Sequence, residues 1–98
     1  MKKFKLELLP EDFKGEYTDN LDCPVCRAVR REIGLPKGMV FALPETVYLT
    51  SKRLKKDDSL SNVIDTYHAP FGGQEHREAM ELVVDKGGRY FVNLTQQI

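Results

Sequence analysis

The chain has 98 residues, of which 41% are hydrophobic and 31% are charged, a balance typical of a folded domain rather than of a disordered segment. Fifteen basic residues offset fifteen acidic ones, so the net charge gives no reason to expect a nucleic acid or an anionic membrane as partner. We expect neither a signal peptide nor a membrane span, because no long apolar run occurs. These features predict a single cytoplasmic domain over residues 1–98, in which cysteines remain thiols.

The first predicted element is a strand over residues 3–8. Its apolar and charged side chains alternate, which is typical of a strand with one buried face. Pro10 ends it, and residues 11–20 form a polar connection.

A helix is predicted over residues 24–33, with both ends marked in the sequence. Pro24 suits the first turn, where a missing N–H costs nothing, and Gly34 suits the left-handed position after the last turn. The stripe of this helix that we expect to face the core consists of Val25, Cys26, Val29 and Ile33.

Two short strands, 39–43 and 46–50, are predicted to form a hairpin, because residues typical of strands flank the turn at Pro44. Apolar residues over 60–67 recur with helical spacing and predict a short helix. The β-branched Val63-Ile64 in its middle leaves a strand possible there.

The last third predicts a second helix over about 74–86 and a strand over 90–94. Acidic residues favour the start of that helix, and Lys86 followed by Gly87 favours its end. The side chains that we expect to face the core are Ala79, Met80, Leu82, Val83 and Val84.

The element order is strand, helix, strand, strand, helix, strand. This order predicts an α+β fold of the ferredoxin-like, or split βαβ, kind, with an antiparallel sheet and the helices on one face. We expect the final strand, Tyr90 to Leu94, to form a sheet edge that can pair with a second copy in a homodimer.

Cys23 and Cys26 are the only cysteines and stand three positions apart where the first helix begins. Two such thiols can form a redox pair, bind a soft metal such as copper(I), or serve as small core residues. Zinc would need two further ligands, and His68 and His76 are the only histidines.

The segment Cys-Pro-Val-Cys and the helix after it resemble the start of a glutaredoxin or thioredoxin, which implies redox chemistry. The rest of the chain departs from that pattern, because the first strand ends near Leu8 and the chain closes with a strand. Heavy-metal-associated domains of the ferredoxin-like fold also carry Cys-x-x-Cys after their first strand. Leu21 and Pro24 depart from their pattern.

Residues 22–31, Asp-Cys-Pro-Val-Cys-Arg-Ala-Val-Arg-Arg, resemble a segment Asp-Cys-Pro-Leu-Ala-Arg-Ala-Leu-Lys-Arg that recurs in small phage and prophage proteins of unknown function. Those proteins have Ala where this chain has Cys26, which favours a structural role for that position. The resemblance implies a phage or prophage setting and brings no activity, cofactor or partner with it.

Two basic clusters are candidates for an interaction surface. Arg27, Arg30 and Arg31 are expected on the solvent face of the first helix. The second cluster consists of Lys52, Arg53, Lys55 and Lys56. Either could contact an acidic protein or phosphates, and binding of nucleic acid would weaken steeply with salt.

We therefore predict a small non-enzymatic interaction module without a cofactor, phage- or prophage-associated, with a protein partner that could belong to the host. The alternative is a thiol-dependent protein that uses Cys23 and Cys26 for redox chemistry or for a soft metal.

Overall fold

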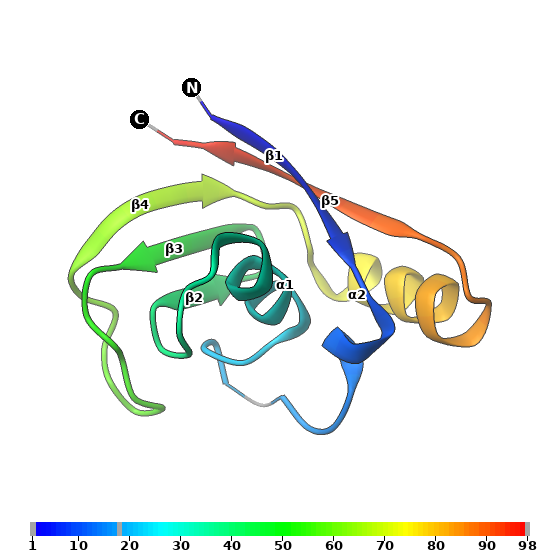
Figure 1. The fold of residues 1–98 in the computed structure, drawn as a ribbon, viewed down its shortest axis with the longest axis horizontal. Helices are drawn as coiled ribbons and strands as arrows, with labels where there is room; N and C mark the ends of the chain where they lie inside the picture. Colours follow the sequence, from blue (N-terminus) through cyan, green and yellow to red (C-terminus); the bar gives the residue numbers. More distant parts are fainter. Residues whose placement is uncertain (1, 18, 98) are drawn as a thin grey trace.

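The five strands form one antiparallel sheet in the order β1-β5-β4-β3-β2 (Figure 1). The computed structural model describes residues 2–17 and 19–97. In chain order the strands are β1 Lys3–Leu8, β2 Val40–Leu43, β3 Thr46–Thr50, β4 Val63–His68 and β5 Tyr90–Gln96. The predicted first strand and the predicted hairpin of β2 and β3 are confirmed.

The helices are α1 (Pro24–Ile33), α2 (Gly73–Met80), a 3-10 helix η1 (Pro10–Phe13), and a π-helical turn η2 (Glu81–Asp85) that continues α2. The predicted bounds of α1 are confirmed, since Cys23 precedes the helix as its N-cap and Gly34 adopts a left-handed φ of 78° after it. Within the described residues, no helix is long and apolar enough to cross a membrane.

The sheet curves around α1, which packs against both outer strands, β1 and β2 (Figure 1). One hydrophobic cluster fills the space between them, and Ala79 and Val83 from α2 and η2 join it. Among the most deeply buried side chains from α1 and the sheet are Leu8, Cys26, Ala28, Val29, Val40, Val47, Tyr67, Val92 and Leu94. Burial of this apolar surface is the main favourable contribution to folding.

The α+β class is confirmed, but the strand order is not a simple ferredoxin arrangement. One difference lies at residues 63–68, for which the helical spacing predicted a helix and the β-branched residues left a strand possible. The segment is strand β4 instead, and it pairs with β3 from Thr46↔His68 to Thr50↔Val63. The extra strand extends the hairpin to a three-stranded meander. In addition, β1 lies at the edge of the sheet and pairs with β5 alone, whereas a ferredoxin-like sheet has its first strand in the middle.

The expectation that the final strand is a sheet edge is wrong. β5 lies between β1 and β4, and it pairs with β1 from Lys3↔Thr95 to Leu8↔Tyr90. It pairs with β4 only at Tyr67↔Gln96 and His68↔Thr95, so residues 90–94 pair with β1 alone. Homodimer formation by another surface stays a prediction.

Two residues expected in the core are exposed. Ile33 is 42% exposed, because it is the last residue of α1. Val84 is 47% exposed, because it lies in the π-helical turn η2, whose wider winding alters the α-helical spacing on which the prediction was based.

Candidate dithiol site

The two thiols lie together at the start of α1 but differ in access to solvent. Cys23 is half-buried, whereas Cys26 is 0% exposed. Their Sγ atoms are 3.3 Å apart, and both are free thiols. The backbone N–H of Cys26 also points at Cys23 Sγ, with an N to Sγ distance of 3.4 Å. The pair is therefore one unit with an accessible and an inaccessible sulfur.

The loop before α1 covers Cys26. The carbonyl oxygen of Asn20 accepts hydrogen bonds from the N–H of Ala42, at 2.8 Å, and from Cys26 Sγ, at 3.1 Å. A second carbonyl, that of Val40, lies 3.7 Å from the same sulfur. The loop is thus bound to the outer edge of β2, and the Cys26 thiol can donate either to a carbonyl or to Cys23.

The surroundings push the pKa values of the two thiols apart. The hydrogen bond from Cys26, together with the backbone N–H groups of Cys26 and Val25, lowers the pKa of Cys23 to about 7 against the effect of burial. The same hydrogen bond and burial raise the pKa of Cys26 well above its usual range. Because Cys23 loses its proton first, Cys26 stays protonated and stabilises the thiolate.

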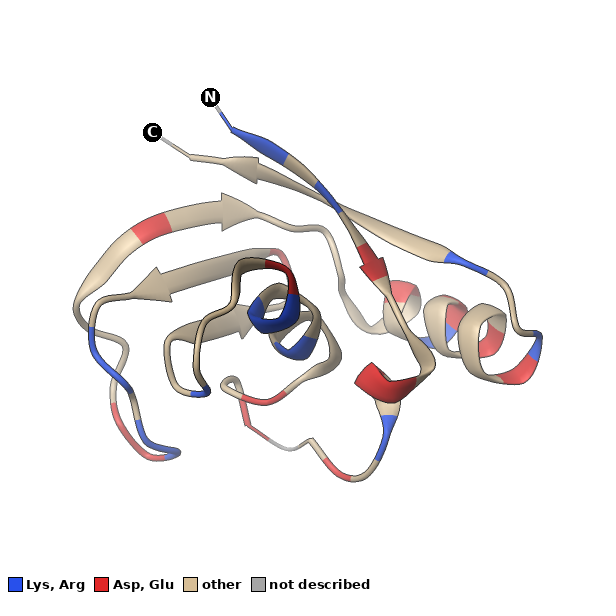
Figure 2. Ribbon diagram, viewed as in Figure 1, with Lys and Arg blue, Asp and Glu red and all other residues tan. Residues whose placement is uncertain are grey.

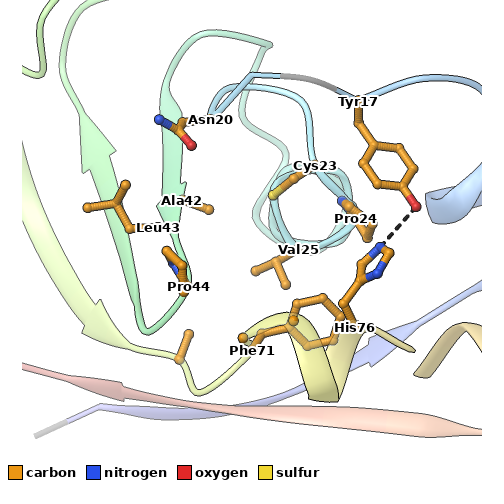
Figure 3. A pocket seen from close by; sticks show the side chains of 13 residues that line it. Tyr17, Asn20, Cys23, Pro24, Val25, Ala42, Leu43, Pro44, Phe71 and His76 are labelled. Atoms are coloured by element: carbon orange, nitrogen blue, oxygen red, sulfur yellow. Dashed lines mark hydrogen bonds between the residues drawn. The ribbon is translucent and has the colours of Figure 1, made fainter. Parts of the chain in front are cut away.

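Cys23 lies at the wall of a cavity of about 240 Å³ between α1, the turn after β2 and the start of α2 (Figure 3). The wall is mostly apolar, and Asn20, Tyr17 and His76 add polar groups to it. The other lining residues are Pro24, Val25, Ala42, Leu43, Pro44, Ala69, Phe71, Gly72 and Gly73. Cys26 is not among them, so only one of the two sulfurs faces the cavity.

Tyr17 and His76 form a hydrogen bond with each other on the cavity wall. The hydroxyl of Tyr17 and Nε2 of His76 are 2.9 Å apart, which Figure 3 marks with a dashed line. The ring of Phe71 packs against the imidazole with its edge, at 5.8 Å between centroids. Burial lowers the pKa of His76 and raises that of Tyr17, which favours the uncharged form of both at neutral pH.

The three helix arginines are not a free basic surface. Arg27 Nε lies 3.0 Å from Asp22 Oδ1, and its other nitrogens donate to backbone carbonyls of the loop before α1, including that of Asp12. Arg30 Nη2 lies 3.1 Å from the same Asp22 oxygen. The side chains of Arg27 and Arg30 are only 18% exposed. The expected solvent face is therefore a contact between α1 and its preceding loop.

Arg31 completes this contact. Its Nη1 lies 2.6 Å from Oδ1 of Asp12, whose side chain is 2% exposed, and its Nη2 donates to the carbonyl of Glu7 at 2.8 Å. The second oxygen of Asp12 accepts from the N–H of Leu9. The arginines thus hold η1 and the loop against α1.

The second basic cluster lies elsewhere, in the loop between β3 and β4 (Figure 2). Lys52, Arg53, Lys55 and Lys56 are exposed, and Leu54 between them is buried. Among the described residues, none of the four cations takes part in an ion pair. Asp58 accepts the N–H of Lys55 and turns the loop.

Few of the described side chains could bind a metal ion together with the two thiols. In the described part of the chain, no three His, Cys, Asp or Glu side chains come together in a way that could hold a metal ion. His68 is exposed on β4, and His76 is bonded to Tyr17. The two sulfurs would be the whole ligand set, which suits copper(I) rather than tetrahedral zinc.

Sequence reasoning identified the two thiols but missed the wall opposite them. Tyr17 and His76 are 59 positions apart, and Tyr17 lies in a polar connection without periodicity. The available signal was a pair of aromatic residues, Phe13 and Tyr17, which are possible anchors in the otherwise polar connection over residues 11–20.

Comparison of the chain with protein-family models, with curated proteins and with solved structures gives no match. The functional interpretation therefore depends on the geometry of the site.

Proposed function

We propose that the protein is a thiol–disulfide exchange protein in which Cys23 is the attacking thiol and Cys26 the resolving thiol. The observation that carries this proposal is the asymmetry of the pair. Two sulfurs lie 3.3 Å apart, one faces a cavity and the other is fully buried. A pair of core residues would need neither the cavity nor the unequal access. The thiol-dependent alternative thus has more support in the geometry than a non-enzymatic interaction module.

The exchange proceeds in two steps. The Cys23 thiolate attacks one sulfur of a substrate disulfide R–S–S–R′, the S–S bond breaks, and R′–S⁻ leaves with its electron pair and takes up a proton. Cys26 then attacks Cys23 Sγ, which forms the intramolecular disulfide and breaks the bond to R–S; R–S⁻ leaves with the electron pair of that bond and takes up the proton that Cys26 loses. The protein dithiol is oxidised by two electrons, and the substrate disulfide is reduced to two thiols.

The geometry suits both steps. A thiolate at a helix N-terminus is stabilised by the unpaired N–H groups, here that of Cys26, which lies 3.4 Å from Cys23 Sγ. Closing the disulfide brings the sulfurs from 3.3 Å to about 2.0 Å, a movement that a change of side-chain rotamer supplies. A second dithiol, such as a reduced oxidoreductase, is needed to return the protein to its starting form.

The test is oxidation of the reduced protein in a series of glutathione redox buffers, followed by acid quenching and intact-mass analysis. We expect both thiols to disappear together with the loss of two hydrogens and without added mass, and dithiothreitol should restore them.

Two single variants serve as controls. Cys26→Ser should accumulate a mixed disulfide with glutathione on Cys23, because the resolving thiol is gone. Cys23→Ser should stay unmodified, because Cys26 is buried. A wild-type protein that keeps both thiols even in a large excess of oxidised glutathione would contradict the proposal, as would modification of Cys26 before Cys23.

As a second candidate, we propose that the basic loop binds an acidic protein surface. Its support is the four exposed cations without an ion-pair partner among the described residues. Binding to an immobilised polyglutamate peptide should fall with salt, and the double variant Lys55→Glu/Lys56→Glu should abolish it. Salt-independent binding or none would contradict this candidate.

The phage or prophage setting stays a prediction from residues 22–31.

A further inference from the structure

We propose that the cavity beside Cys23 selects small disulfides whose attacked sulfur carries an uncharged, apolar group. This inference rests on the proposed exchange function and names the substrate class for the same site. It commits the cavity to a low-molecular-mass substrate, with the apolar group seated against the wall while the thiolate attacks its sulfur.

The chemistry of the wall supports an uncharged occupant. None of the described residues that line the cavity is Asp, Glu, Lys or Arg. The polar groups of Tyr17 and His76 are bonded to each other at 2.9 Å, so they offer little to a charged ligand. A carboxylate moved onto this wall would lose hydration without meeting a cationic side chain among the described lining residues. A disulfide with charged arms, such as oxidised glutathione, should therefore react without help from the cavity.

Three charged side chains lie near the cavity: Arg27 and Glu75, which are bonded to other groups, and Arg77, whose Nη1 lies 3.5 Å from the position that a Cβ on Gly73 would take. The guanidinium of Arg27 lies over the ring of Tyr17, 5.2 Å from the ring centroid, and forms an ion pair with Asp22. Glu75 accepts the N–H of Gly72 at the start of α2. None of these three side chains is among the residues that line the cavity.

The size of the cavity restricts the substrate further. Its volume of about 240 Å³ lies below the roughly 300–1,000 Å³ of pockets for drug-sized ligands. It suits a group such as a benzyl or a short alkyl chain. The rings of Phe71 and Tyr17 and the side chain of Val25 line the space that this group would occupy (Figure 3).

The test uses methanethiosulfonates, which convert a thiolate directly to a disulfide. The Cys23 thiolate attacks the sulfenyl sulfur of R–S–SO₂CH₃, a new S–S bond to R–S forms, and methanesulfinate leaves with the electron pair of the broken bond. The four reagents carry methyl, benzyl, anionic sulfonatoethyl or cationic trimethylammonioethyl groups. Each rate constant is divided by that for N-acetylcysteine and then by the methyl value, which cancels the thiolate fraction.

For the wild-type protein we expect the normalised rate of the benzyl reagent to exceed that of the methyl reagent by roughly tenfold or more. The reason is that the benzyl ring moves from water into the apolar cavity. The two charged reagents should show no such gain. Equal normalised rates for benzyl and anionic reagents would overturn the inference.

Leu43 provides a matched pair of variants, because it lines the cavity and is 41% exposed. Leu43→Glu should slow the anionic reagent about threefold, and Leu43→Lys should speed it by a similar factor. Both should reduce the benzyl advantage. Unchanged selectivity in both variants would show that the reagents do not enter the cavity and would contradict the inference.

The two proposals fail in different ways. A protein that forms the Cys23–Cys26 disulfide reversibly but does not prefer the benzyl reagent keeps the exchange function and loses the substrate class. A protein that forms no such disulfide loses both.

Discussion

The start of helix α1 and its arginine face both carry candidate functional side chains, but these differ in what they are free to bind. At the start of α1, Cys23 faces a cavity and shares its polar contacts with Cys26. Along the rest of the helix, Arg27 and Arg31 are bonded to carboxylates and carbonyls of the preceding loop. The cysteine end thus has a sulfur available to a ligand, and the arginine face does not.

This difference shows that residue type alone does not define a functional surface. From the sequence, the arginines suggested a binding face and Cys26 a core position. The structure uses the arginines to hold the loop that carries Asp12 and Asp22, and the same loop reaches β2 and covers Cys26 through the carbonyl of Asn20. The arginine contacts therefore hold in place the loop that covers Cys26.

The largest expected effect comes from removing Arg31. Arg31→Ala leaves the carboxylate of Asp12, which is 2% exposed, without its cation. We expect a loss of about 3 kcal/mol in the free energy of unfolding, reduced from the value for a fully buried pair because the Arg31 side chain is 31% exposed. Urea unfolding measures it. The control is Arg53→Ala in the exposed loop, expected within about 0.5 kcal/mol of wild type. Equal effects of the two variants would mean that the arginine face is not structural.

A smaller effect is expected at Asp22, which pairs with Arg27, Arg30 and Lys37. Asp22→Asn should cost about 1–2 kcal/mol at pH 7. The hydrogen bond from Arg27 lowers the pKa of Asp22, so its stabilising contribution is present above the unfolded-state value and is lost as the pH falls through the folded-state value.

The wild type should therefore lose more stability than Asp22→Asn as the pH falls below about 4. Urea midpoints measured from pH 7 down to acid pH check this. Parallel curves for the two proteins would contradict the assigned pairing.

The smallest effect is expected at Tyr17, because this residue lines the cavity but takes no part in the proposed reaction. Tyr17→Phe removes the hydrogen bond to His76 and keeps the ring, so it should cost about 1 kcal/mol or less. The alkylation rate of Cys23 should stay within about twofold, since a wall residue does not exchange protons with the thiol. A large loss of rate would mean that Tyr17 takes part in the reaction of Cys23 and does not merely line the cavity.

Local sequence signals predicted the elements better than their arrangement. Helix α1 was predicted with its bounds, because Pro24 and Gly34 mark its ends. Residues 63–68 fitted a helical period, and the β-branched Val63 and Ile64 left a strand possible; pairing with β3 makes them a strand. That pairing is a long-range contact, so the order of the sheet does not follow from local patterns.

The site was predictable to the extent that its residues are close in the chain. Cys23 and Cys26 stand three positions apart, so their proximity follows from helix geometry. The wall formed by Tyr17 and His76 comes from segments 59 positions apart, which only the fold brings together. The arginine partners were hidden for a similar reason, since they are mostly backbone carbonyls of a loop without regular structure.

The most direct test of this account is the pH dependence of Cys23 alkylation by iodoacetamide, measured by mass analysis of the reduced protein. We expect a midpoint near the pKa of about 7 for Cys23, so that about half of it is thiolate at pH 7, against about 3% for an ordinary thiol. In Cys26→Ala the midpoint should move up, because the hydrogen bond from Cys26 is gone. A midpoint near 8.5 in both proteins, or no reaction of Cys23 at all, would contradict the assignment of Cys23 as the attacking thiol.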